Sequence, residues 1–491
     1  MLLMGMKPRL LSRPKLAEGG MAASGRRKAR ADVANRVHYE TIDRRLRIAS
    51  DGTTCKHPRY FGGGELSLGL PRVRLLQIGD LHLPTAARTE RTVDQKDRTF
   101  SVELRNVISR QPIKTVFKRI YRMCEDKNVD GILLMGDMTD FGKLDGYKAG
   151  LAYVANALQL GGTRRNASTF CGIVPGNHDI DRALAKKPSM LAKFKPLNAA
   201  LDAAGFGRMP VESSLVSHVG PQDAQCAVVL MNSCWGCGAV EYIPAEFRDS
   251  VGPAIEAAIA SGDPKVLSAY YDRQFDTPAF SDASISHLVE ITDTLPREQQ
   301  LVVVAHHNLL PQRLTRLAPY TELVNSGAVR ASLMEARRPI LYLHGHIHTD
   351  PIEVLSVPGG DVLVCISAPA AEAGFNVIEV VFTRSGNPLV GHILPWRFDQ
   401  SGVLREGARL TVPLIGKRRR SLDDGLAKVY AYLLSVRQCY WSDLLHNCGP
   451  HFQTEADSQL QESIELLMAD QSITVENYDA RPDSWIMEAR I

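Results

Sequence analysis

Five short segments of the sequence end in clusters of carboxylate, imidazole and amide side chains. The clusters are Asp80 and His82; Asp137 and Asp140; Asn177, His178 and Asp179; His306 and His307; and His344, His346 and His348. Oxygen and nitrogen donors of intermediate hardness suit divalent transition metals such as manganese, iron or zinc. No thiolate belongs to the set, which argues against a structural zinc site. The side-chain types therefore predict a transition-metal centre.

Each cluster follows a run of β-branched and aliphatic residues. The five stretches read VRLLQIGDLH, GILLMGDMTD, FCGIVPGNHD, LVVVAHHNLL and ILYLHGHIH. Such continuous apolar runs are typical of strands that are buried on both faces, and helical patterns at 116–127 and 147–160 alternate with them. The alternation predicts an α/β architecture, with the polar clusters gathered at the carboxyl edge of the sheet.

The ordered set of motifs resembles the calcineurin-like metallophosphoesterase family. That family has D-x-H, then GDxxD or GDxxN, GNH followed by D or E, a later histidine at a strand end, and GHxH. This sequence has DLH from Asp80 to His82, GDMTD from Gly136 to Asp140, GNHD from Gly176 to Asp179, His306 in AHHN, and GHIH from Gly345 to His348. The resemblance covers about residues 72–400. It implies an α/β fold in which a two-sheet β-sandwich is flanked by helices, giving four α/β/β/α layers.

The resemblance also implies two divalent transition-metal ions, manganese or iron, with zinc as the alternative. Asp137 would bridge the two ions. One ion would be completed by Asp80, His82 and His348, and the other by Asn177, His306 and His346. A hydroxide that bridges the metals would attack the phosphorus atom.

Further roles follow from the same resemblance. His178 would stand beside the leaving group and donate a proton or a hydrogen bond to it. Asp140 would orient His178, with a turn-capping role as the alternative. Of the two adjacent histidines in AHHN, we favour His306 over His307 as the ligand.

Other polar residues near the motifs receive structural interpretations. Asp179 is expected to accept hydrogen bonds from backbone N–H groups, and His344 to pack beside the site. Cys234 and Cys237 form a lone CxxC after a strand. Because no second cysteine pair lies nearby and the context is not thioredoxin-like, we expect neither zinc nor redox chemistry there. We expect two thiols in a loop beside the active site.

The motif style favours one branch of the family. The segments IGDLHL, GDMTDFG, PGNHDIDR and AHHNLLP look most like the bacterial class III cyclic-nucleotide phosphodiesterases. Protein serine/threonine phosphatases typically have GDxxDRG, and Phe141 stands where their arginine would be. We therefore expect a binuclear enzyme that hydrolyses a phosphodiester or a phosphomonoester. One alternative is a DNA-processing nuclease of the SbcCD-like branch, whose HxN strand end resembles AHHN. A non-catalytic scaffold on the same fold is a second alternative.

Length and charge suggest three parts for this chain of 491 residues. We predict a disordered basic arm at 1–36, a metallophosphoesterase domain with insertions at 37–415, and a small winged-helix-like α+β module at 416–491. The arm lies in a stretch, 1–50, with twelve basic and four acidic side chains, whereas residues 421–491 hold four basic and twelve acidic ones. After residue 350 the pattern changes to strands and turns, which predicts a second sheet.

The charge pattern also bears on partners. An acidic C-terminal module is a poor surface for nucleic acid, since phosphate neutralisation needs Lys and Arg. We therefore expect a protein partner or self-association through this module, although the basic arm and the run from Lys417 to Arg420 could contact nucleic acid. No apolar run is long enough to cross a membrane. Nine scattered cysteines indicate reduced thiols and a cytoplasmic location.

Overall fold

A computed structural model describes most of the chain. The described residues are 69–83, 111–139, 142–185, 187, 189–238, 245–262, 277–311, 323–349, 351–356, 361–415, 424–452 and 455–490. All of them belong to one compact unit, Ser67–Ile491. The predicted basic arm, Asp140 and the linker from Gly416 to Ser421 lie outside the described residues, and the bounds of the three predicted parts stay predictions.

The first sheet has seven strands in the order β12-β11-β10-β1-β2-β3, with β13 paired to β11. Strands β1, β2 and β3 are parallel, and β10 and β11 continue the sheet in antiparallel pairing. The bounds are β1 Arg72–Ile78, β2 Gly131–Leu134, β3 Phe170–Ile173, β10 Gly374–Phe382, β11 Pro388–Phe398, β12 Leu404–Glu406 and β13 Leu410–Pro413.

The second sheet has six strands in the order β4-β5-β6-β7-β9-β8. Its centre is parallel from β5 to β9, and the edge strands β4 and β8 are antiparallel to their neighbours. The bounds are β4 Leu215–Val219, β5 Cys226–Leu230, β6 Gln300–Val304, β7 Ile340–His344, β8 Ile352–Ser356 and β9 Val362–Ser367.

The strands after residue 350 correct one of our expectations, because they do not form a sheet of their own. Strands β8 and β9 extend the second sheet, whereas β10 to β13 extend the first. All nine residues of β10 are buried, so this strand suits a central position, which it takes between β1 and β11. The late strands thus complete both sheets of the sandwich.

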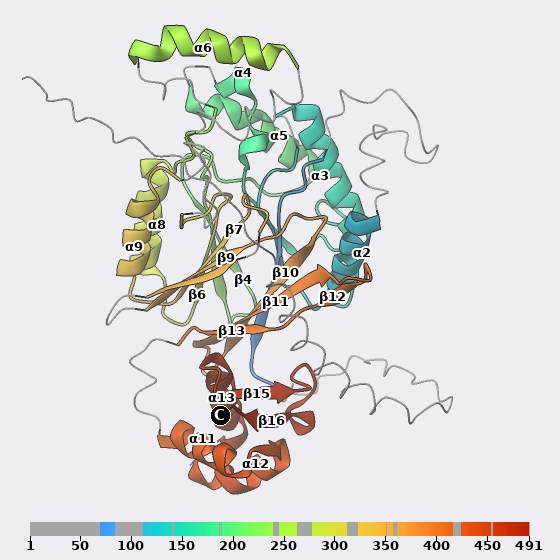
Figure 1. Ribbon diagram of the computed structural model, residues 1–491, viewed down its shortest axis with the longest axis vertical. Coiled ribbons are helices and arrows are strands. Elements are labelled where there is room, and N and C mark those ends of the chain that lie inside the picture. The colour runs from blue at the N-terminus through green and yellow to red at the C-terminus, as the bar shows by residue number, and fades with distance from the viewer. Residues whose placement is uncertain are drawn as a thin grey trace, which may run out of the picture. The chain divides into compact units, whose positions relative to one another are not determined.

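Three layers of apolar side chains confirm the predicted α/β/β/α arrangement. Between the sheets, Val73 and Leu133 pack with Val302 and Leu341. The outer face of the first sheet packs against α2 Gln111–Glu125, α3 Leu144–Leu158 and α5 Lys195–Ala204. The outer face of the second sheet packs against α8 Asp282–Thr294 and α9 Ser326–Glu335, on the opposite side of the sandwich (Figure 1).

Apart from the helices of the C-terminal segment, which are given next, the remaining helices within the described residues are short or peripheral. They are α4 Arg182–Ala185 and α6 Ala245–Ala260, with 3-10 turns at Asn177–Asp179, Met190–Lys193, Gly449–His451 and Pro482–Ser484. No helix of the described part is both long and apolar enough to span a membrane.

The C-terminal segment builds a small core of its own. It contains α11 Asp424–Val436, β14 Gln438–Tyr440, α12 Trp441–Cys448, α13 Ala456–Ala469, β15 Ile473–Glu476 and β16 Ile486–Ala489. The three strands pair in the order β14-β16-β15. Within the described residues the segment is therefore a unit of three α-helices and one small antiparallel sheet. Its winged-helix identity stays a prediction.

Helix α13 joins this module to the first sheet (Figure 1). Leu466 and Ala469 pack against Leu389 and Val390 of β11. Beside them, Glu465 is fully buried and lies against His392 of β11. The inner face of α13 is therefore occupied by the sandwich.

Candidate metal centre

The seven side chains predicted as metal ligands come together where five strands end. They follow β1 (Asp80, His82), β2 (Asp137), β3 (Asn177), β6 (His306) and β7 (His346, His348). Strands β1 to β3 belong to the first sheet and β6 and β7 to the second. The residues therefore meet across both sheets, which corrects the single sheet edge that we expected.

One group consists of Asp80, His82 and His348. Nε2 of His348 lies 2.7 Å from Oδ2 of Asp80 and 3.1 Å from Nε2 of His82. Their ligand atoms all lie within 4.8 Å of one another, a spacing that a single cation can span. The Asp80 carboxylate is buried, whereas the His348 side chain is 44% exposed, so the group opens to solvent.

The second group surrounds the ring of His306. Its Nε2 lies 2.9 Å from Oδ1 of Asn177 and 3.4 Å from Oδ2 of Asp137. The ring of His346 lies beside it, with ring centroids 5.2 Å apart. Oδ2 of Asp137 is also 3.8 Å from Nε2 of His82, so this carboxylate touches both groups.

The backbone around the ligands is strained. Positive φ angles occur at His82 (46°), Asp137 (49°), His346 (68°) and His348 (54°). Residues other than glycine adopt this left-handed region at a cost, and such positions cluster at functional sites. The chain thus accepts the conformational cost of positive φ angles at these four positions, and the ligand side chains are placed together as a result.

The glycines of the GN and GH motifs are required by close approach to carboxylates. A Cβ atom on Gly176 would stand 2.1 Å from Oδ1 of Asp137, and one on Gly345 would stand 2.4 Å from Oδ1 of Asp80. Any larger residue would push the carboxylate out of the site. The motif spacing therefore reflects how tightly the two ligand loops pack.

Charge interactions keep the carboxylates ionised. Burial alone would raise the pKa of Asp137, but the charges of His306 and His178 outweigh it and hold that pKa well below its usual value. The same balance of burial against His306 lowers the pKa of Asp80. Burial would lower the pKa of His306, yet the Asp137 carboxylate raises it to about 10. Two buried anionic groups thus stand where cations would bind.

The residues present fit a pair of divalent transition metals. Nε2 of His346 is buried and has no hydrogen-bond partner among the described residues. Burial, with the charge of His306, lowers the pKa of His346 to about 3, so its ring is neutral and offers a lone pair. A buried polar atom without a partner is costly unless a ligand satisfies it. Imidazole, carboxylate and amide oxygen are suitable donors for such metals.

Of the two predicted catalytic residues, the structure describes His178 but not Asp140. The backbone N–H of His178 donates to Oδ1 of Asp137 at 2.8 Å, and the His178 ring lies edge-on to His82, with centroids 4.9 Å apart. The side chain of His178 is therefore beside the ligand group of His82. Asp140 lies outside the described residues, so its role stays a prediction.

Asp179 takes the backbone-binding role that we expected. It accepts hydrogen bonds from the N–H groups of Gly176, at 2.9 Å, and Thr139, at 3.1 Å. These bonds tie the loop after β2 to the loop after β3. Burial, followed by the charge of Asp137, raises the pKa of Asp179 to about 7.

The two adjacent histidines of AHHN face different ways. His306 faces Asp137 and Asn177, whereas Nδ1 of His307 lies 2.9 Å from Oγ of Ser233 on the opposite side. This orientation supports our preference for His306. His344 is buried beside the site, with Nδ1 3.1 Å from the carbonyl oxygen of Gly345.

Sequence reasoning missed a polar bridge beneath the site. Gln77 is fully buried in β1, and its Nε2 donates to the carbonyl oxygens of His344 and Ile366 in the other sheet. Its Oε1 accepts a bond from Asn376 of β10. A single amide thus links the two sheets behind the ligand loops. The signal was one glutamine in the otherwise apolar run LLQI.

Comparison with known proteins finds a family model that matches about a third of the chain. The calcineurin-like phosphoesterase model matches residues 73–232. The resemblance seen in the motifs is thereby confirmed. The matched segment holds the DLH, GDMTD and GNHD motifs, and the structure places His306, His346 and His348 against them. The expected reaction class, a metal-dependent phosphoric ester hydrolase, is supported by this match.

Several solved structures are similar to this chain at low identity. A dimetal phosphatase from Danio rerio is 13% identical, with a TM-score of 0.40, over 70% of this chain and 100% of that one. A 5'-nucleotidase precursor from Thermus thermophilus is 14% identical, with a TM-score of 0.34, over 74% of this chain and 59% of that one. A purple acid phosphatase from yellow lupin is 9% identical, with a TM-score of 0.38, over 71% of this chain and 55% of that one. A search of curated proteins gave no match.

Proposed function

We propose that this protein hydrolyses a phosphodiester, or a phosphomonoester, at a centre of two metal ions. The observation that carries the proposal is the position of Asp137. One oxygen of its carboxylate lies 3.4 Å from Nε2 of His306 and 3.8 Å from Nε2 of His82, which belong to the two ligand groups. A carboxylate placed between two sets of donors is suited to bridge two cations.

Each ligand has a distinct task in this proposal. Asp80, His82 and His348 would hold one ion, Asn177, His306 and His346 would hold the other, and Asp137 would contribute to both. When bound, a pair of manganese or iron ions, or zinc, supplies an activated water nucleophile and neutralises charge on the phosphate. Gln77 and Asp179 hold the ligand loops in position, because each forms hydrogen bonds with backbone groups of the ligand-bearing segments.

His178 is the proposed proton donor to the leaving group. Its backbone is fixed by the bond to Asp137, while its ring is half-buried beside His82. A half-buried imidazole next to the ligands can meet a substrate oxygen without being a ligand itself. Such assistance contributes about 10²–10⁴-fold to the rate. Asp140 is proposed to orient His178.

The substrate we favour is a cyclic nucleotide or another small diester. The motif style supports this class. The nine buried residues of α13 argue only against that helix as a nucleic-acid-binding surface. A protein partner or self-association through the C-terminal module remains proposed. A cytoplasmic location rests on the cysteines, of which the eight in the described residues are free thiols.

A metal-dependent hydrolysis assay tests the proposal. The purified protein, loaded with Mn²⁺, is incubated with bis-p-nitrophenyl phosphate, and then with cyclic nucleotides, nucleotides, phosphoproteins and single- and double-stranded DNA. We expect hydrolysis of the generic diester that is lost with EDTA and restored by Mn²⁺. Preferential cleavage of DNA would favour the nuclease alternative. A metal-loaded protein inactive on every substrate would favour the scaffold alternative.

A further inference from the structure

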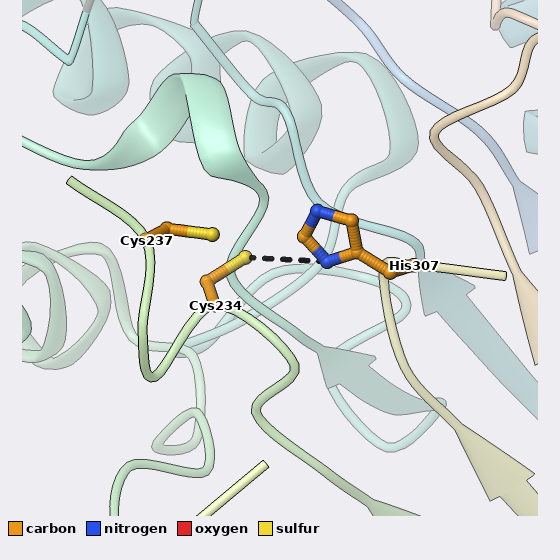
Figure 2. A group of neighbouring side chains, drawn as sticks. All are labelled: Cys234, Cys237 and His307. Carbon is orange, nitrogen blue, oxygen red and sulfur yellow. Dashed lines mark hydrogen bonds between the residues drawn. The ribbon is translucent and has the colours of Figure 1, made fainter. Parts of the chain in front are cut away.

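A second cluster of possible metal-ligand side chains lies beside the candidate centre, because its His307 ring packs against His346. Figure 2 shows the three residues of this cluster. Cys234 and Cys237 come from the loop after β5, and His307 comes from the loop after β6. All three are buried, with exposed fractions of 0%, 0% and 1%. Figure 2 shows both sulfur atoms turned toward the space in front of the imidazole ring. The CxxC therefore has a third donor that lies far away in the sequence.

We propose that Cys234, Cys237 and His307 bind a thiophilic divalent cation, Zn²⁺, at a site separate from the two-metal centre. Sγ of Cys234 lies 4.0 Å from Nδ1 of His307, and the three ligand atoms all lie within 4.8 Å of one another. Zinc bonds of about 2.3 Å to sulfur and about 2.0 Å to nitrogen place tetrahedral sulfur and nitrogen ligands about 3.5 Å apart. Closing the cluster onto zinc thus needs a shift of about half an ångström at the sulfur–nitrogen pair.

Neighbouring bonds prepare the histidine for this role. Oγ of Ser233 accepts a hydrogen bond from the backbone N–H of His307 at 3.1 Å, so the hydroxyl hydrogen is available to Nδ1, 2.9 Å away. That arrangement favours the tautomer in which Nδ1 carries a lone pair and Nε2 carries the hydrogen. A cation can take the lone pair, while Ser233 keeps its bond to the backbone.

A buried lysine also holds the CxxC loop in place. Nζ of Lys193, a residue only 1% exposed, donates to the backbone carbonyl oxygens of Trp235 and Cys237. These bonds fix the turn between the two cysteines, so little conformational freedom is lost when both thiols engage one ion. Zinc sites with three protein ligands, Cys₂His among them, leave the fourth position to water.

Charge and reactivity favour a metal over a disulfide switch. Two thiolates and a neutral imidazole cancel the charge of Zn²⁺, so the occupied site is neutral in surroundings that include Ile180 and Phe194. Without a cation, burial raises the pKa of the Cys234 thiol well above its ordinary value. A thiol that is buried and protonated is a poor nucleophile toward oxidants.

The proposed site supports the candidate two-metal centre. The ring of His307 packs against that of His346, with centroids 4.5 Å apart, and His307 directly follows His306. A cation on His307 would hold its ring in place and so position two candidate ligands on the other side. The two sites stay chemically distinct, because only this one has sulfur donors.

Cobalt spectroscopy of the full chain tests the site without relying on activity. The protein is expressed in cobalt-supplemented medium, so that the buried site fills during folding, and its absorption spectrum is recorded. We expect thiolate-to-cobalt charge transfer in the near ultraviolet, which the oxygen and nitrogen donors of the two-metal centre cannot produce. Cobalt-loaded wild-type protein without this band would overturn the proposal, as would a Cys234–Cys237 disulfide in protein purified without oxygen.

Matched variants assign the band to the cluster. Cys234→Ala should abolish the band and remove one metal equivalent per chain. Cys365→Ala, at another buried cysteine, should retain both the band and the metal. If the Cys234 variant does not fold, zinc X-ray absorption on the wild-type protein decides the question, since only a sulfur-bound zinc shows a shell at about 2.3 Å. Absence of that shell would count against the site.

Discussion

Two buried polar networks in this protein differ in how completely they are satisfied. The junction between the sandwich and the C-terminal module pairs its groups: both oxygens of Glu379 bond to Arg72 and Arg74, and both oxygens of Glu465 bond to His392 and Tyr478. The candidate metal centre, by contrast, leaves Nε2 of His346 without a partner among the described residues and places four ligands at positive φ.

The difference separates groups that stabilise the fold from groups held for chemistry. Buried polar groups in folded proteins almost always have hydrogen-bond partners, and a complete network contributes to stability. Strained backbone and an unmatched lone pair are tolerated where a ligand will use them. Substitutions at the centre should therefore remove activity with little loss of stability, and substitutions at the junction should do the reverse.

The largest effect is expected for Asp137→Asn. Asparagine keeps the shape of the side chain but loses the charge that would attract both cations, so hydrolysis of bis-p-nitrophenyl phosphate should fall by about 10⁴-fold or more. Bound metal, measured by mass spectrometry, should fall as well. The melting temperature of the metal-free protein reports separately on the loss of the charge pair between Asp137 and His306. Asp202→Asn, on the exposed face of α5, is the matched control. Full activity in Asp137→Asn would refute the bridging role.

His178→Ala should have the next largest effect. Loss of a proton donor to the leaving group should lower turnover by about 10²–10⁴-fold. Metal content should be unchanged, since alanine retains the backbone N–H that bonds to Asp137 and the His178 ring is not one of the seven proposed ligands. His287→Ala is a suitable control, because this half-buried histidine bonds to Ser213 and Ser214 and lies outside the ligand loops. Loss of metal in His178→Ala would instead make His178 a ligand.

Much of the centre could be predicted from the sequence because its donors sit next to strands in short motifs. Apolar runs such as ILLM and VVVA are typical of strands buried on both faces, and the residues that follow parallel strands meet at a common end of the sandwich. The two sheets could not be assigned, because which strands pair depends on contacts between distant segments. The donor set of Cys234, Cys237 and His307 was hidden for the same reason. The role of Gln77 could not be predicted either, because its hydrogen-bond acceptors lie in the other sheet.

At the junction, Glu379→Gln should affect stability and leave activity unchanged. Arg72 and Arg74 would lose the anion that compensates them, and removing one partner of a buried ion pair costs about 3–5 kcal/mol of unfolding free energy. The Arg72 guanidinium lies 2.9 Å from Glu379, and both carboxylate oxygens are used. Urea unfolding measures the loss, with exposed Glu488→Gln as the control. A change below about 1 kcal/mol, the size of an exposed pair, would show that the junction is not a stabilising network.

The smallest predicted effect is the acid sensitivity of this junction. Burial would raise the pKa of Glu379, but the charges of Arg72 and Arg74 outweigh it and lower that pKa to about 2. A carboxylate with a lowered pKa stabilises the fold above its unfolded pKa of about 4.3, and this contribution disappears as the pH falls toward about 2. The expected loss across that interval is about 3 kcal/mol. Unfolding free energies measured from pH 6 down to pH 3 should therefore decrease more steeply in the wild type than in Glu379→Gln. Equal slopes in the two proteins would mean that Glu379 is not held ionised by the two arginines, and that the junction owes its stability to apolar packing of α13 instead.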